Sequence, residues 1–138
     1  MKTIVLGYDD GDGAKRALSR AASLARQLEA RLVVLSVART ATSAARFVGG
    51  TVDPVDAPPR HRRQLENARA MLEDADVEVE YEVGLGEPAD VIVDVSAERA
   101  ADLIVVGTNG AGLITRFFGL SVGDSVRRRA GCDVLVVQ

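Results

Sequence analysis

Short apolar runs and longer stretches of periodically spaced apolar residues follow one another along the chain. A short, nearly continuous apolar run is typical of a strand covered on both faces of a parallel sheet, and apolar residues spaced three and four apart are typical of an amphipathic helix. Runs of the first kind occupy residues 4–8, 32–37, 103–106 and 134–137. In residues 77–83 valine and tyrosine alternate with acidic residues, which predicts a strand with one exposed face at a sheet edge.

Helices are expected between these strands and before the last one. They are predicted over residues 12–29, from Pro58 onward, after Gly86-Glu87-Pro88 and over residues 121–129. The side chains expected on their inner faces include Leu28, Leu65, Ala68, Leu72, Ala89, Ile92, Val93 and Ser96. The charged residues around the second helix start, Arg60, Arg62 and Arg63, are expected to face water, and His61 between them as well.

The order of these elements predicts the fold class. Strands that alternate with helix-length crossovers form a parallel sheet with right-handed connections, so we expect one α/β domain over residues 1–138, a doubly wound sheet with helices on both faces. Residues 39–57 show no sustained period and are predicted to form a long surface connection of unknown role. No internal repeat or low-complexity linker interrupts this organisation.

The charge balance and the cysteine content narrow the class of partner. The chain has 17 basic and 20 acidic residues, a net charge of -3, which argues against nucleic acid or a membrane surface as the main partner. Cys132 is the single cysteine, so it cannot form an internal disulfide and is expected to be a small core residue. No signal segment and no run of about 18 apolar residues is found, so a cytoplasmic location is expected.

Candidate ligand contacts gather where the predicted strands end. The carboxyl ends of parallel strands border the ligand crevice of an open sheet, and those ends carry Asp9, Val37 and Gly107. The glycine-rich residues 107–112 and the helix that begins near Ser121 would offer backbone N–H groups to a phosphate. The lysine of a Walker loop is missing after Gly112, and Arg16 stands where a Rossmann fingerprint needs glycine, so both common nucleotide motifs fail.

The chain as a whole resembles the universal stress proteins. The resemblance is carried by Ile-Val-Leu-Gly-Tyr-Asp-Asp-Gly at residues 4–11, by Leu35-Ser36-Val37, by Gly86-Glu87-Pro88-Ala89 and by residues 101–107. It implies a five-stranded sheet of order 3-2-1-4-5, similar to the adenine nucleotide alpha hydrolases. The ATP-binding branch of that family has a loop of pattern G-x2-G-x9-G-[ST]. Gly107, Gly110 and Ser121 match this pattern, but Leu120 stands in place of the third glycine.

The resemblance implies a nucleotide site that holds ATP, alone or with Mg²⁺. Asp9 would accept a hydrogen bond from the adenine amino group, and the backbone of Val37 would read the base edge. Ribose and phosphates would lie against the remaining positions, which are Val106, Gly107, Thr108, Gly110, Ser121 and Val122. Asn109 replaces a histidine that many relatives carry.

Plainer roles exist for several of these residues. Asp9 and Asp10 could end the first strand and cap the first helix, and Ser121 with Asp124 has capping-box spacing. A response-regulator receiver would also have an acidic pair after its first strand, but the phosphoacceptor aspartate after the third strand is missing. His61 is the single histidine, and no catalytic triad or metal-ligand spacing can be assembled around it.

We therefore expect an adenine-nucleotide-binding module with a regulatory or stress-response output, and not primarily an enzyme. Two alternatives stay open: a nucleotide-free dimeric stress protein that acts by protein interaction, and a slow Mg²⁺-dependent ATP hydrolase that would rely on Asp9, Asp10 and Arg116. The last strand, Val134 to Val137, would expose unpaired backbone groups at a sheet edge. Relatives pair this strand across a two-fold axis, so a homodimer through it is expected.

Overall fold

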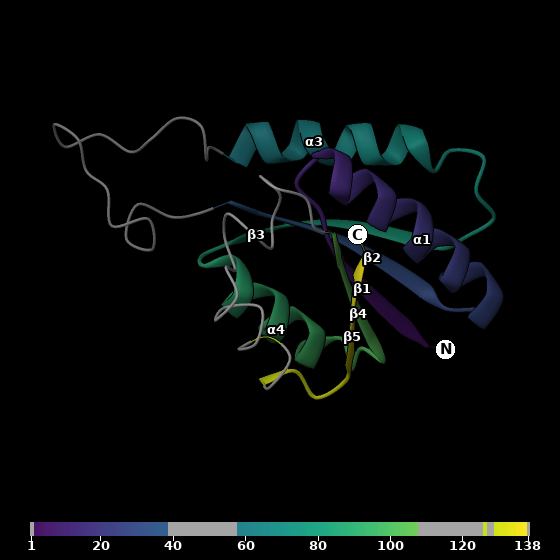
Figure 1. Cartoon of the computed structure of the whole chain (residues 1–138). Coiled ribbons are helices and arrows are strands. Elements are labelled where there is room, and N and C mark those ends of the chain that lie inside the picture. The colour runs from purple at the N-terminus through teal and green to yellow at the C-terminus, as the bar shows by residue number, and fades with distance from the viewer. Residues whose placement is uncertain (1, 39–57, 108–125, 127–128, 138) are drawn as a thin grey trace, which may run out of the picture.

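The computed structural model describes residues 2–38, 58–107, 126 and 129–137, which form one parallel sheet and three helices in the described ranges (Figure 1). The strands are β1 (Thr3–Gly7), β2 (Arg31–Ala38), β3 (Val79–Leu85), β4 (Leu103–Gly107) and β5 (Asp133–Val137). The helices are α1 (Asp12–Leu28), α3 (Pro58–Met71) and α4 (Pro88–Glu98). Residues 39–57 and most of 108–128 lie outside the described ranges, and so does most of the helix expected at 121–129.

The sheet has the predicted order. Its five strands run β3-β2-β1-β4-β5, and every neighbouring pair is parallel. Val5 in the central strand pairs with Val33 of β2 on one side and with Ile104 of β4 on the other. Since the chain moves outward to β3 and then crosses back to β4, the connections change direction beside β1, which is the switch point where an open sheet binds ligands.

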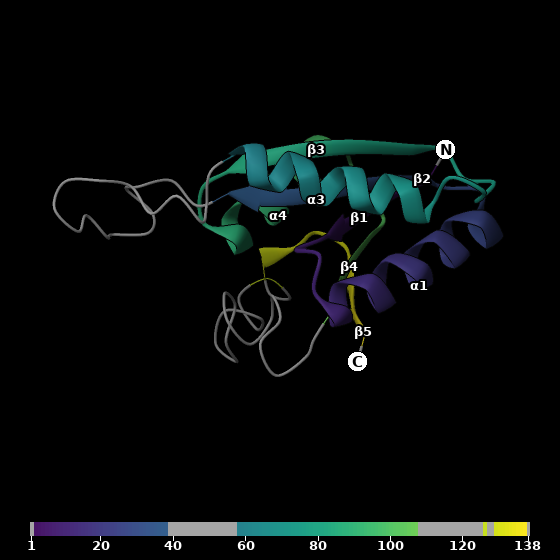
Figure 2. The same cartoon turned by 90° about the horizontal axis from the view of Figure 1, so that it is seen from above.

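Helices cover both faces of the sheet. Figures 1 and 2 show α1 and α3 side by side on one face, with α3 over β2 and β3, and α4 on the opposite face. Successive side chains of a strand point to opposite faces, so Ile4 and Leu6 pack with α1 and α3 while Val5 packs with α4. The central strands are therefore buried on both faces, as their continuous apolar runs predicted.

The faces of the three described helices agree with the expected pattern except at Leu28, His61 and Val95. Leu65, Ala68, Leu72, Ala89, Ile92 and Ser96 are buried as predicted. Leu28 was predicted to face the core and is 45% exposed, because α1 ends there and Glu29 turns the chain toward β2. His61 was predicted to face water and is only 6% exposed, although its arginine neighbours are exposed. Val95 of α4 is buried and was not singled out by the sequence pattern.

The edge strand β3 is tied to the sheet by ion pairs on its solvent-facing side. Arg99, just beyond α4, bonds Glu80 and reaches Glu82 at 3.0 Å. Arg31 of β2 lies 3.3 Å from Glu78 and 3.8 Å from Glu80. The hydrogen bond from Arg99, supported by the charges of Arg99 and Arg31, lowers the pKa of Glu80. The acidic residues that alternate along this strand are therefore held by arginines of its neighbours.

Cys132 lies just before β5 and packs against the cluster beneath α4. Burial, followed by the charges of Asp133 and Asp102, raises the pKa of its thiol. A thiol that keeps its proton is a weak nucleophile, so the packing role expected from the sequence fits this position. Over the part of the chain that the structure describes, no helix is both long and apolar enough to cross a membrane.

Candidate functional site

The carboxyl ends of β1, β2 and β4 bring together four of the predicted site residues. Gly7 pairs with Leu35 on one side and with Val106 on the other, and Tyr8 donates its backbone N–H to the Leu35 carbonyl at 2.9 Å. Asp9, two residues beyond Gly7, therefore lies at the level of Val37, one residue before the end of β2, and just past the level of Gly107, the last residue of β4. The predicted contacts Asp9, Val37, Val106 and Gly107 share one edge of the sheet, next to the switch point.

Gly107 makes the closest approach at this edge. A Cβ atom on Gly107 would lie 2.3 Å from the carbonyl oxygen of Gly13 and 2.9 Å from the amide nitrogen of Ala14. No side chain fits there, because both contacts are backbone atoms of the first turn of α1. The sequence predicted Gly107 as a phosphate contact, and the structure adds a packing reason for glycine at this position. The contact places the first turn of α1, whose first N–H groups have no partner within the helix, against the carboxyl end of β4.

Asp9 lies in the turn that joins β1 to α1. Its side chain is half-buried, and Oδ1 accepts a hydrogen bond from the backbone N–H of Gly11 at 3.0 Å. The alternative role of helix cap, considered for Asp9 and Asp10, is wrong in its detail. Gly11 is the N-cap residue, and no side chain makes the cap hydrogen bond. The Asp9 carboxylate accepts instead from the N–H of Gly11, which precedes the first residue of the helix.

Asp10 turns toward α3. Tyr8 donates its phenolic O–H to Oδ1 at 2.8 Å, and Asn67 donates its side-chain N–H to Oδ2 at 3.0 Å. Tyr8 is 2% exposed, and this burial, together with the bond to Asp10 and the charges of Asp10 and Asp9, raises the pKa of its phenol far above the usual range. The phenol therefore remains a donor to the Asp10 carboxylate at every physiological pH.

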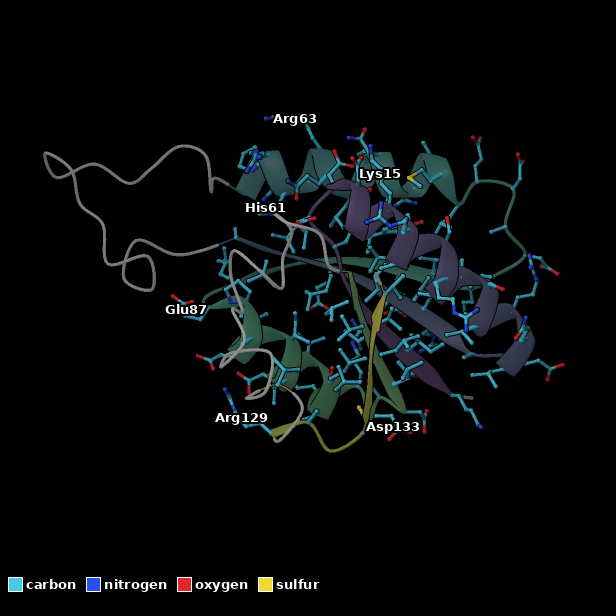
Figure 3. The ribbon with its side chains drawn as sticks, viewed as in Figure 1. Lys15, His61, Arg63, Glu87, Arg129 and Asp133 are labelled. Carbon is cyan, nitrogen blue, oxygen red and sulfur yellow. The ribbon has the colours of Figure 1, made fainter. Side chains whose placement is uncertain are left out.

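A second polar cluster lies between β2 and α3, next to Val37 in the sequence. Ser36 of β2 is fully buried, with its Oγ 2.6 Å from Nδ1 of His61 and 3.0 Å from Oε1 of Gln64, both from α3. In Figure 3 Arg63 projects from the outer side of α3, whereas His61 is turned inward by this contact. This cluster was not predicted from the sequence, where His61 was expected to face water. The helical spacing of His61, Gln64 and Ala68, one inner face with polar residues at its start, was the signal that could have revealed it.

The remaining predicted contacts lie outside the described residues. They are Thr108, Gly110, Ser121 and Val122, together with Leu120. Arg129, which is among the described residues, lies beside α4 and bonds Asp90 at 2.8 Å (Figure 3). Among the residues that the structure describes, no group of three or more histidine, cysteine or carboxylate side chains is arranged to hold a metal ion.

The chain matches a known protein family along its whole length. A sequence profile described as the Universal stress protein family matches residues 1–138. The chain belongs to the universal stress protein family. A universal stress protein of Staphylococcus aureus (strain USA300) is 31% identical over 139 residues, which cover 99% of this chain and 84% of that protein.

Solved universal stress proteins share the fold. One that was crystallised in complex with cAMP is 29% identical, with a TM-score of 0.70 over 99% of this chain and 96% of its own. Another, from Archaeoglobus fulgidus in complex with dAMP, is 26% identical, with a TM-score of 0.72 over 100% of this chain and 98% of its own. The resemblance predicted from the sequence and the strand order 3-2-1-4-5 are thus both confirmed.

Proposed function

We propose that this universal stress protein binds an adenine nucleotide at the carboxyl edge of β1, β2 and β4, and that ATP, alone or with Mg²⁺, is its ligand. The proposal rests above all on Asp9, a carboxylate held beyond β1 by the N–H of Gly11 at 3.0 Å, beside the end of β2. Family members solved with cAMP and with dAMP support an adenine nucleotide as the ligand class.

The described residues suit the roles that the resemblance implies. Oδ1 of Asp9 is engaged by Gly11, and the proposal assigns the adenine amino group to the same carboxylate. A carboxylate accepts several hydrogen bonds, so both contacts are compatible. Val37 is half-buried one residue before the end of β2, where its backbone would meet the base edge. Val106 and Gly107 would lie against the ribose, with Thr108, Gly110, Ser121 and Val122 around the phosphates.

Calorimetric titration of nucleotide-stripped protein with ATP, ADP, AMP and cAMP, with and without Mg²⁺, tests this proposal. We expect binding that Asp9→Ala weakens by about 1.5–3 kcal/mol, because the base loses a charge-assisted hydrogen bond. Asp74→Ala is the matched control, since Asp74 is an exposed carboxylate in the connection after α3, at the opposite end of the sheet. Equal affinities of the Asp9→Ala and Asp74→Ala variants would refute the assignment of Asp9.

Leu120 gives the nucleotide-free alternative a specific basis, because leucine stands where the family loop has glycine. The same titration on Leu120→Gly separates the two functions. If leucine at position 120 is compatible with the site, the natural protein and the Leu120→Gly variant both bind the nucleotide. If only the Leu120→Gly variant binds it, the natural protein acts without nucleotide. Phosphate release from ATP in Mg²⁺ is the corresponding measurement for the slow hydrolase.

We also propose a homodimer through β5. This strand pairs with β4 on one side and forms an edge of the sheet on the other, with Val134 to Val137 half-buried. Sedimentation at micromolar concentration should give the dimer mass. Amide hydrogen exchange should show protection of alternate β5 amides that increases with protein concentration, because only outward-facing N–H groups pair with a second copy. The cytoplasmic location and the absence of nucleic-acid or membrane partners stay predictions.

A further inference from the structure

Asp10 has a backbone conformation that residues other than glycine rarely adopt. Its φ is 67°, in the left-handed region, where a side chain with a Cβ costs energy unless the surroundings enforce the conformation. Aspartate and asparagine tolerate this region better than most residues. Asp10 directly follows Asp9, the proposed adenine contact. The contacts that hold Asp10 in this conformation therefore also determine the direction of the Asp9 side chain.

Two side-chain hydrogen bonds hold Asp10 in this conformation. Oδ1 of Asp10 accepts the phenolic O–H of Tyr8 at 2.8 Å, and Oδ2 accepts the Nδ2–H of Asn67 at 3.0 Å. Both carboxylate oxygens are thus engaged by donors with different origins, one at the end of β1 and one on α3. The carboxylate is drawn toward α3, whereas Oδ1 of Asp9 is engaged by Gly11 at the start of α1. The two neighbouring carboxylates therefore make separate contacts.

The donors themselves are well anchored. Tyr8 is 2% exposed in the core cluster beneath α1 and α3, its backbone N–H bonds the Leu35 carbonyl at 2.9 Å, and its hydroxyl lies 3.9 Å from Sδ of Met71. Asn67 belongs to the middle of α3, which is packed on β2 and β3. A turn that is fixed at both of its ends has little freedom to redirect the side chain between them.

We infer that Asp10, held by Tyr8 and Asn67, is a positioning residue that fixes the turn of residues 8–11 and thereby orients the Asp9 carboxylate toward the nucleotide. The inference rests on the proposed function, since it concerns the same site. It assigns a role to α3, because Asn67 reaches the site only through Asp10. Asp10 itself makes no contact with the ligand, and its contribution to affinity is indirect.

A swap of the two partners tests the inference. In Asp10→Asn the amide oxygen still accepts from Tyr8, and the Asn67 amide can rotate to accept from the new N–H, so ATP affinity should stay within about twofold. In Asn67→Asp two carboxylates face each other, and affinity should fall about tenfold. The double variant Asp10→Asn with Asn67→Asp restores an amide–carboxylate pair of reversed polarity, so it should recover to within about twofold of the natural affinity.

Controls separate orientation from charge and from folding. Asp12→Asn removes a negative charge from an exposed side chain in the first turn of α1, so it reports the bare charge effect on an anionic ligand. Asn67 is exposed, so its substitution leaves the core intact, and all affinities are measured well below the thermal midpoint of each variant. A residue that acts only on stability would shift the midpoint without changing the affinity of the folded protein.

The outcomes are distinct. Loss of affinity in Asn67→Asp and recovery in the double variant would support the positioning role. Unchanged affinity in Asn67→Asp, or a loss that the double variant does not recover, would overturn it while leaving the Asp9 site in place. Failure of the natural protein to bind any adenine nucleotide would overturn the proposed function and the positioning role together.

Discussion

Oγ of Ser36 lies 2.6 Å from Nδ1 of His61, so the single histidine of the chain is hydrogen-bonded inside the interface between β2 and α3. Gln64 completes the contact with Oε1 3.0 Å from the same hydroxyl. All three side chains are buried. A buried polar cluster of this kind favours one particular docking of α3 on the sheet, because any shift would break its bonds without water to replace them.

Removing the hydroxyl should destabilise the fold. Ser36→Ala takes away the partner of both His61 Nδ1 and Gln64 Oε1, and we expect a loss of about 1–3 kcal/mol in the free energy of unfolding. Ser19→Ala, on the exposed side of α1, is the matched control and should stay within about 0.5 kcal/mol of the natural protein. Urea denaturation followed by circular dichroism measures both. Equal midpoints for the two variants would contradict the structural role of the cluster.

The same cluster predicts the tautomer of His61. The Ser36 hydroxyl has one proton, and if it donates to Oε1 of Gln64, its oxygen is left to accept a proton from Nδ1 of His61. Nitrogen-15 NMR of the imidazole should therefore show a protonated Nδ1 in the neutral form, with no other histidine to obscure the signal. A neutral ring protonated at Nε2 would instead mean that Ser36 donates to the ring and that Gln64 is oriented the other way.

The sequence predicted the sheet far better than it predicted these polar contacts. Apolar periodicity reports burial by large clusters, so it predicted the five strands correctly, and the family resemblance supplied their order. The burial of His61 was missed because its neighbours Arg60 and Arg62 are exposed, and a helix turns adjacent residues about 100° apart, so charged neighbours say little about one position. The side-chain bonds of Asp10 depend on the packing of α3, more than 50 residues further along the chain, which no local pattern reports.

Gly107 should tolerate no side chain. Gly107→Ala would place a Cβ atom 2.3 Å from the Gly13 carbonyl oxygen, and backbone must move to admit it, which we expect to cost about 1–3 kcal/mol or more of unfolding free energy. Gly131→Ala is the matched control, because a Cβ there meets no atom within 4 Å. Thermal unfolding compares the pair. The assigned packing role would be wrong if both variants unfolded at the same temperature.

Nucleotide binding gives the Gly107→Ala variant a second use. If the α1 N-terminus has to shift to admit the new methyl group, the turn that holds Asp9 moves with it, and ATP affinity should fall as well as stability. A loss of stability with no loss of affinity would show that the contact between β4 and α1 supports the fold alone.

The ion pair between Glu80 and Arg99 should appear in the acid stability of the protein. The pKa of the Glu80 carboxyl in the folded protein is lower than the ordinary value of 4.5, so the unfolded state binds the proton more tightly. The stabilisation is therefore fully present above about pH 4.5 and is lost as the pH falls below that value toward the folded pKa. Glu80→Gln should lower stability at pH 7 and flatten the fall in stability between neutral and acid pH.

Glu73→Gln, at an exposed position after α3, is the control. Urea midpoints across this pH range measure the effect, and parallel pH profiles for the Glu80→Gln variant and the natural protein would show that solvent screens the pair completely.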